Sequence, residues 1–184
     1  MNKLFSVLVV IAGLLLTLNL SASAQEEQVA GNLFYTEIGG PGVFMSANFD
    51  SRFSSNGRLG FGFRLGAGFS IGDIQDSEPD RWGYYNTVTR TYYSIPAGLN
   101  YVFGKPYSSK TFEVGAGVTL LTRKVSLFYH GYERKPGNVI GFFTFMYRLM
   151  PLDGGFSFRV GLTPVIGTGG DMFPMGAIGI GYVF

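Results

Sequence analysis

The amino-acid sequence predicts an all-β fold, an eight-stranded antiparallel up-and-down transmembrane β-barrel behind an export leader. Three observations predict it: an N-terminus typical of a signal peptide, strict alternation of apolar and small or polar residues, and connections that alternate between short and long. The composition agrees, because only 14% of the 184 residues are charged, well below the ~25% of ordinary soluble domains.

Residues 1–24 have the three parts of a secretory signal peptide. Lys3 supplies the positive charge, residues 4–20 are predominantly apolar, and Ala22-Ser23-Ala24 is a small-residue cleavage site. We expect cleavage after Ala24, which leaves residues 25–184 as a single barrel domain. The alternative is a retained membrane anchor, because about 17 apolar residues could just span a bilayer.

The segment 59–71 illustrates the alternation. Its odd positions are apolar, as at Phe61 and Phe63, whereas its even positions are glycine, serine and Arg64. A period of two is the signature of a strand. Seven further segments follow the same rule, so the predicted strands are residues 33–39, 43–53, 59–71, 89–103, 111–128, 138–149, 155–166 and 173–184.

Two features leave the strand boundaries open. Gly39-Gly40-Pro41-Gly42 is consistent with a tight turn or with a kink, so residues 33–53 form either two strands or one kinked strand. Pro96 and Pro164 fall inside predicted strands, where each removes a ladder hydrogen bond. We expect a bulge or a local irregularity at each proline.

The connections favour a membrane barrel. Short polar turns near Gly57, Pro106 and Gly154 all fall at one end, and longer stretches fall at the other, as in outer-membrane barrels. Aromatic residues gather at the short-turn end, where a girdle would meet the lipid headgroups. A soluble β-barrel or sandwich with an apolar interior remains the alternative, although its outer face would need charge for solubility and the apolar face here has almost none.

In a barrel of eight strands, the interior is just wide enough to be filled by side chains. The less apolar face of each predicted strand would line this lumen, so we expect its polar side chains to form a network that plugs the lumen. A gated or narrow polar path is the alternative, and it would prefer anions because arginines outnumber carboxylates. The predicted network consists of Glu37, Asp50, Arg52, Arg64, Arg90, Asn100, Glu113, Arg123, Arg148 and Arg159.

The sequence offers little catalytic chemistry. It has no cysteine and one histidine, which excludes a disulfide scaffold, a thiol nucleophile and a multi-histidine metal site. The net charge of +2 gives no footprint for nucleic acid. We therefore expect no enzyme activity, no cofactor, no metal and no nucleic-acid partner.

The chain resembles the small outer-membrane β-barrels of Gram-negative bacteria, the OmpA-like and OmpX-like eight-stranded barrels. The most specific part of the resemblance is the C-terminus, where Ile180, Tyr182 and Phe184 are similar to the β-signal that the outer-membrane insertion machinery reads. The resemblance implies an outer-membrane location, contact with membrane lipid and lipopolysaccharide, a monomer, and a structural, surface-interaction or ligand-binding role. It does not extend to the periplasmic peptidoglycan-binding domain that OmpA-type proteins often carry after the barrel.

Two other functions stay open at this point. One is transport of a small polar solute or a lipid. The other is lipid A modification, since some outer-membrane barrels are enzymes of this kind that use a Ser/His/acid set near the outer rim. Ser126, His130 and Glu133 are the candidates, but Ser126 and His130 would lie ~13 Å apart along a strand, too far for the hydrogen-bonded chain that such a set needs.

Overall fold

A computed structural model of the chain describes residues 30–54, 57–79, 81, 85–125, 137–167, 170 and 172–184. Among these residues no helix is long and apolar enough to cross a membrane. The elements are β1 (Leu33–Gly39), the short 3₁₀ turn η1 (Gly40–Gly42), β2 (Met45–Arg52), β3 (Gly60–Pro79), β4 (Tyr85–Gly104), β5 (Lys110–Val125), β6 (Gly137–Leu149), β7 (Gly155–Ile166) and β8 (Met172–Val183).

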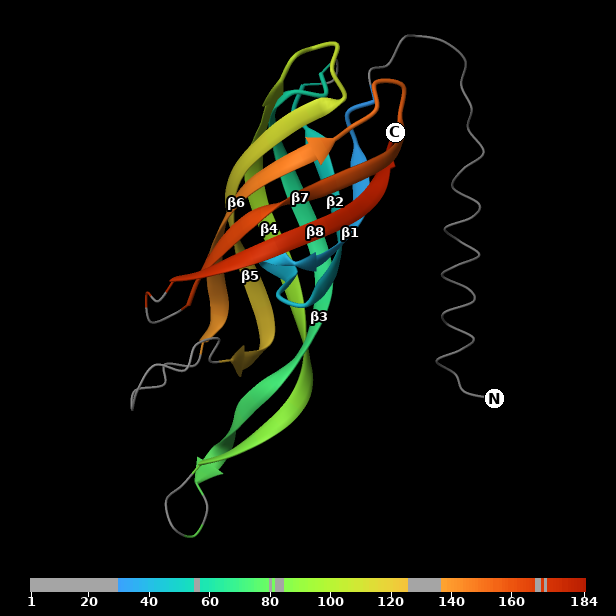
Figure 1. The fold of residues 1–184 in the computed structure, drawn as a ribbon. Helices are drawn as coiled ribbons and strands as arrows, with labels where there is room; N and C mark the ends of the chain where they lie inside the picture. Colours follow the sequence, from blue (N-terminus) through green and yellow to red (C-terminus); the bar gives the residue numbers. More distant parts are fainter. Residues whose placement is uncertain are drawn as a thin grey trace, which may run out of the picture.

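The strands form one closed barrel in chain order (Figure 1). Each strand is antiparallel to the next, and β8 returns to pair with β1, with Val183 opposite Leu33. Closure leaves no unpaired edge around the ring, which is the condition for strands that cross a bilayer. The predicted fold class, an eight-stranded up-and-down barrel, is confirmed.

The polarity of the barrel wall is the reverse of that in a soluble protein. Outward positions are apolar and exposed, as at Phe61, Leu99 and Phe145, whereas the inward residues Arg64 and Arg148 are buried. In a soluble barrel these apolar residues would fill the centre. The apolar outer wall and polar interior are those of a transmembrane β-barrel, so the soluble alternative is excluded.

The two ends of the barrel differ. The connections β2–β3, β4–β5 and β6–β7 meet at the turn end, together with Phe184, which pairs with Asn32. At the opposite end, here called the loop end, β3 and β4 run on well beyond their neighbours (Figure 1). The β2–β3 ladder stops at Met45 and Phe69, and the β4–β5 ladder begins at Ser94. Residues 71–79 of β3 and 85–91 of β4 therefore continue as a two-stranded ribbon outside the closed ring.

The open question about residues 33–53 is answered by two separate strands. β1 ends at Gly39, η1 reverses the chain, and β2 begins at Met45. At each proline the expected irregularity takes the form of a gap in the ladder and not of a bulge. Pro96 stays in register opposite Thr119, and Pro164 stays opposite Pro174. On its other side each proline falls in a short gap of the ladder with no change in register, because a proline cannot donate a ladder hydrogen bond.

Candidate functional site in the barrel lumen

Strand alternation directs eight of the ten predicted lumen residues into the barrel. All of them are buried, and they come from β1, β2, β3, β4, β5, β6 and β7. A side chain that points inward from one strand of so narrow a barrel meets side chains from the opposite wall. These residues are Glu37, Asp50, Arg52, Arg64, Asn100, Glu113, Arg148 and Arg159.

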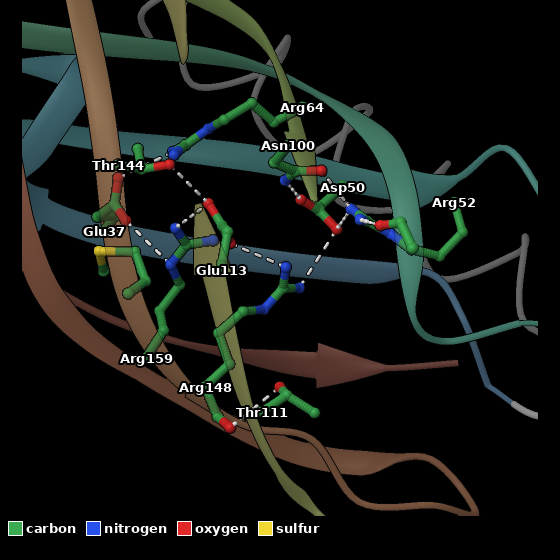
Figure 2. Close-up of polar contacts among 12 residues, drawn as sticks. Glu37, Asp50, Arg52, Arg64, Asn100, Thr111, Glu113, Thr144, Arg148 and Arg159 are labelled. Carbon is green, nitrogen blue, oxygen red and sulfur yellow. Dashed lines mark hydrogen bonds and ion pairs between the residues drawn. The ribbon is translucent and has the colours of Figure 1, made fainter. Parts of the chain in front are cut away.

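Seven of these residues form an unbroken series of alternating charges, which we call the charge chain (Figure 2). It contains four arginines and three carboxylates, so each carboxylate lies between two guanidinium groups. The ion pairs run in order from Arg64 to Glu37 (3.0 Å), to Arg159 (3.1 Å), to Glu113 (3.3 Å), to Arg148 (2.9 Å), to Asp50 (3.2 Å) and to Arg52.

Neutral side chains complete the network. Thr144 donates a hydrogen bond to Glu113 Oε1 (3.1 Å). Asn100 donates to Asp50 and accepts a hydrogen bond from Arg52 (2.7 Å). Buried charges are tolerated only when they are paired and their remaining polar atoms find partners. Thr144 was absent from the predicted set, although its inward position in β6 follows from the same alternation.

The Arg64 end of the charge chain is packed against aromatic rings. The guanidinium carbon of Arg159 lies 4.2 Å from the centre of the Tyr35 ring, and that of Arg64 lies 5.6 Å from the same ring and 5.7 Å from Phe142. Ring faces attract cations. Nε and Nη1 of Arg64 and Nη1 of Arg159 have no hydrogen-bond partner within the described part of the chain. Donor capacity is therefore in excess at this end.

The turn end of the lumen is closed by apolar side chains and by an arginine that the sequence analysis missed. The apolar cluster consists of Ala30, Leu33, Tyr35, Met150 and Val183. Arg58, only 3% exposed, donates to the carbonyl oxygens of Ser108 (2.7 Å) and Met150 (3.0 Å), and so ties together all three short turns.

Arg58 differs from the arginines of the charge chain because it forms no ion pair with a carboxylate in the described residues. Burial lowers the pKa of its guanidinium, and the positive charge of Arg148 lowers it further, yet an arginine stays protonated in proteins. No local signal marked Arg58, since it lies in a turn and not in an alternating segment.

The loop end is closed by η1, which folds into the barrel. Gly40, Pro41 and Gly42 are buried and lie against β3, β4, β5, β7 and β8. Thr119 donates to the Pro41 carbonyl (2.8 Å), and Ser94 donates to that of Gly42 (3.0 Å). The lumen is thus sealed at both ends and occupied by charges between them.

Arg90 and Arg123 do not belong to the lumen network, and that expectation is corrected. Both are exposed. Each has the inward parity of its strand, but each lies beyond the point at which the β4–β5 ladder ends, at Ser94 and Leu121. No opposite wall faces them there, so parity no longer implies burial.

The remaining predictions concern the C-terminus and the catalytic alternative. Ile180, Tyr182 and Phe184 lie on the outer wall and are exposed. Ser126, His130 and Glu133 lie outside the described residues, as does the predicted signal peptide of residues 1–24. Within the part of the chain that the structure describes, no group of three or more histidine or carboxylate side chains could hold a metal ion.

The solved structures to which this chain is similar share little sequence with it. No family model and no curated protein sequence matches the chain. Among solved structures, the outer membrane protein Ail of Yersinia pestis in a phospholipid bilayer nanodisc is 13% identical over 84% of this chain and 99% of its own, with a TM-score of 0.45. The crystal structure of Yersinia pestis Ail with the heparin analogue sucrose octasulfate is 12% identical over 83% and 94%, with a TM-score of 0.38.

The architecture is therefore assigned from the geometry of the barrel itself. A closed ladder, an apolar outer wall and a charged, filled lumen occur together in this chain. These are the properties of the barrels that bacteria build into their outer membranes. The chain has the architecture of a small eight-stranded outer-membrane β-barrel, as its sequence resemblance implied.

Proposed function

We propose that this protein is an outer-membrane barrel whose closed body supports a surface for interaction at the loop end. One observation carries the proposal. The lumen is closed at three levels, whereas β3 and β4 continue past the ring as the ribbon formed by residues 71–79 and 85–91. The structure therefore provides a rigid wall and a projecting surface, and it leaves no open passage through the described part of the barrel.

The closed lumen argues against transport through the barrel. An ion that crossed it would have to displace the turn-end cluster, separate pairs such as Glu113–Arg148 and move η1 aside. Breaking a buried pair by removing one partner costs about 3–5 kcal/mol, and several pairs would have to separate together. We therefore propose a structural and surface-interaction role, with no conducting path in the resting state.

The proposal includes a location, an orientation and partners. Residues 1–24 are removed on export, and the outward row of Ile180, Tyr182 and Phe184 serves as the signal for the insertion machinery. The loop end faces the cell exterior and the outer leaflet, where lipopolysaccharide surrounds it, and the barrel acts as a monomer. The apolar wall supports the contact with lipid, and the projecting ribbon supports the orientation, because the longer connections of such barrels face outward.

Protease treatment of intact cells tests the orientation. Arg81, Arg90 and Arg123 are exposed at the loop end, whereas Lys105 and Lys110 are exposed at the turn end. Trypsin should cut only at basic residues of the loop end, which also include the exposed Lys124, in intact cells and at both ends after the outer membrane is permeabilised. Cleavage at Lys105 in intact cells would reverse the orientation.

A planar lipid bilayer tests the closed lumen. The purified, refolded protein should show no conductance steps, even at high protein concentration. Reproducible steps that are lost on heat denaturation would contradict a resting barrel without a conducting path and would favour the transport alternative.

A further inference from the structure

The connection between β1 and β2 has more structure than a turn needs. Residues 39–44, here called the latch, place η1 inside the ring and are held by hydroxyl groups from three strands. Thr119 of β5 donates to the Pro41 carbonyl, and Ser94 of β4 and Ser70 of β3 both donate to that of Gly42 (3.0 and 3.3 Å). The Phe44 amide in turn donates to Ser70 Oγ (3.1 Å). These contacts lie far apart in sequence, so they form only when the ring closes.

The latch is also strained. Gly39 and Gly40 have positive φ angles of 74° and 68°, which glycine adopts readily. Val43 has φ 75° and ψ −68°, where a β-branched residue is a genuine outlier. Its side chain packs against Tyr92, Leu121 and Ile140. Such strain persists only where the surroundings impose it, and it is typical of elements that move.

The latch covers the Arg64 end of the charge chain. A Cβ atom on Gly40 would lie 2.8 Å from Glu37 Oε2, so the latch rests directly on that carboxylate. Glu37 holds both Arg64 and Arg159, and each of these two arginines keeps at least one buried nitrogen atom without a hydrogen-bond partner in the described residues, as several other lumen arginines do. Four arginines face three carboxylates in the charge chain. The surplus of one positive charge and of donors matches a small oxyanion.

We propose that residues 39–44 are a latch over a blind binding pocket for a small oxyanion of the size of phosphate. When the latch swings out, the space that Gly40, Pro41 and Gly42 fill becomes the pocket, and its floor is the Glu37 carboxylate together with the two arginines that neutralise it, Arg64 and Arg159. The pocket is blind because the rest of the charge chain and the turn-end cluster stay in place below it. The proposal is independent of surface interaction by the ribbon, and it is compatible with a lumen that does not conduct.

A single engineered cysteine can test the latch because the chain has no cysteine of its own. Ser46 is 2% exposed and lies directly behind Gly42, whose Cβ would approach the serine side chain to 2.5 Å. In Ser46→Cys, labelling by small anionic and cationic methanethiosulfonates should be slow. Adding Ser94→Ala and Thr119→Val removes two of the three hydroxyl groups that hold the latch. It should raise the labelling rate at least tenfold, with the anionic reagent faster than the cationic one.

Two variants at Val43 isolate the strain. Val43→Ala and Val43→Gly both lose the packing of the valine side chain, but only glycine relieves the positive φ. In the Ser46→Cys background the alanine variant should therefore label several-fold faster than the glycine variant. Equal labelling rates would show that the backbone strain at Val43 does not promote opening of the latch.

A matched control separates latch opening from loosening of the whole barrel. Ser157 is 1% exposed, faces inward from β7 and lies near the turn end, opposite Gly181. Ser157→Cys should stay unlabelled in the latch-release background. If it accelerates as much as Ser46→Cys, or if Ser46→Cys does not accelerate at all, the latch proposal is overturned.

Inorganic phosphate tests the ligand class. In the latch-release variant of Ser46→Cys, millimolar phosphate should slow labelling by the uncharged reagent methyl methanethiosulfonate at least threefold, whereas chloride at the same ionic strength should leave the rate unchanged. Protection by chloride as well would show charge screening and not a site, and absence of protection by phosphate would overturn the oxyanion pocket.

Discussion

Two pairs of arginines have the same position in the strand alternation and opposite environments. Arg64 and Arg159 lie inside the closed ring and are buried against carboxylates and the Tyr35 ring. Arg90 and Arg123 have the same inward parity but lie past the last β4–β5 pair and are exposed. Alternation therefore decides which face a side chain occupies, and ring closure decides whether that face is an interior. Substitutions in the two regions should therefore change the stability of the barrel by very different amounts.

The largest effect is expected within the charge chain. Glu113→Gln keeps a hydrogen-bond partner for Thr144 but leaves Arg148 and Arg159 with one carboxylate fewer. Leaving a buried charge uncompensated costs about 3–5 kcal/mol. The free energy of unfolding should fall by that amount in urea titrations that follow the mobility of folded and unfolded bands in unheated gels. A loss below about 1 kcal/mol would mean that the chain behaves like surface ion pairs.

A charge on the outer wall should have the next largest effect. Leu99→Arg places a guanidinium on the lipid-facing surface of β4, where a charge near the bilayer midplane costs about 2–4 kcal/mol. Tyr107→Arg is the matched control, because Tyr107 is exposed in the β4–β5 turn outside the wall. Unfolding from lipid vesicles should separate the two variants, and equal stabilities would contradict a lipid-facing β4.

Packing across the lumen predicts a smaller loss. A Cβ on Gly117 would lie 2.3 Å from the Ala97 carbonyl oxygen and 2.5 Å from the Phe142 ring, whereas a Cβ on Gly141 would meet only Ile166 at 3.8 Å. Gly117→Ala should therefore destabilise the barrel by about 1–3 kcal/mol through overpacking. Gly141→Ala should stay close to wild type in the same urea titration, and the reverse order would contradict the packing described here.

The hydrogen bonds by which Arg58 connects the three short turns should contribute less to stability. Arg58→Lys keeps the charge but removes the terminal Nη2 atom that donates to the carbonyls of both Ser108 and Met150. Loss of one such hydrogen bond should cost about 1 kcal/mol. Differential scanning calorimetry in detergent micelles can resolve that change, and an unchanged transition would show that the three turns are held by other contacts.

The smallest effect belongs to the arginines beyond the ring. Arg90→Ala and Arg123→Ala should each change the unfolding free energy by less than about 0.5 kcal/mol, as is usual for exposed positions. The same urea titrations as for Glu113→Gln give the comparison directly. A loss for Arg123→Ala as large as that for Glu113→Gln would place Arg123 in the network after all.

The sequence was sufficient for the parts of the fold that depend on local periodicity. Period-two alternation located all eight strands and the inward face of each, because a strand repeats every two residues whatever its partners are. It underestimated β3 and β4, which were expected to span 59–71 and 89–103 but extend to Pro79 and start at Tyr85. The ladders with β2 and β5 stop before these residues, so no closed ring imposes a hydrophobic alternation on them.

The parts that escaped prediction depend on contacts between distant residues. Gly40-Pro41-Gly42 was expected to be a turn or a kink, but its inward fold is imposed by hydroxyl groups on β3, β4 and β5. Arg58 becomes buried only because three separate turns converge on it. For Arg90 and Arg123, the length of the neighbouring strands determined exposure, and alternation within a strand carries no information about its neighbours.

The central claim is that the odd-numbered face of β4 contacts lipid while the even-numbered face lines a filled lumen. Nitroxide labels on single cysteines at the outward positions Ile95 and Leu99 and at Tyr107 in the β4–β5 turn, with the barrel in phospholipid vesicles, test the lipid-facing half of the claim most directly. We expect Ile95 and Leu99 to be accessible to oxygen dissolved in the lipid and not to a water-soluble nickel chelate, and Tyr107 to be accessible to the nickel chelate. High accessibility of Ile95 and Leu99 to the nickel chelate would contradict it.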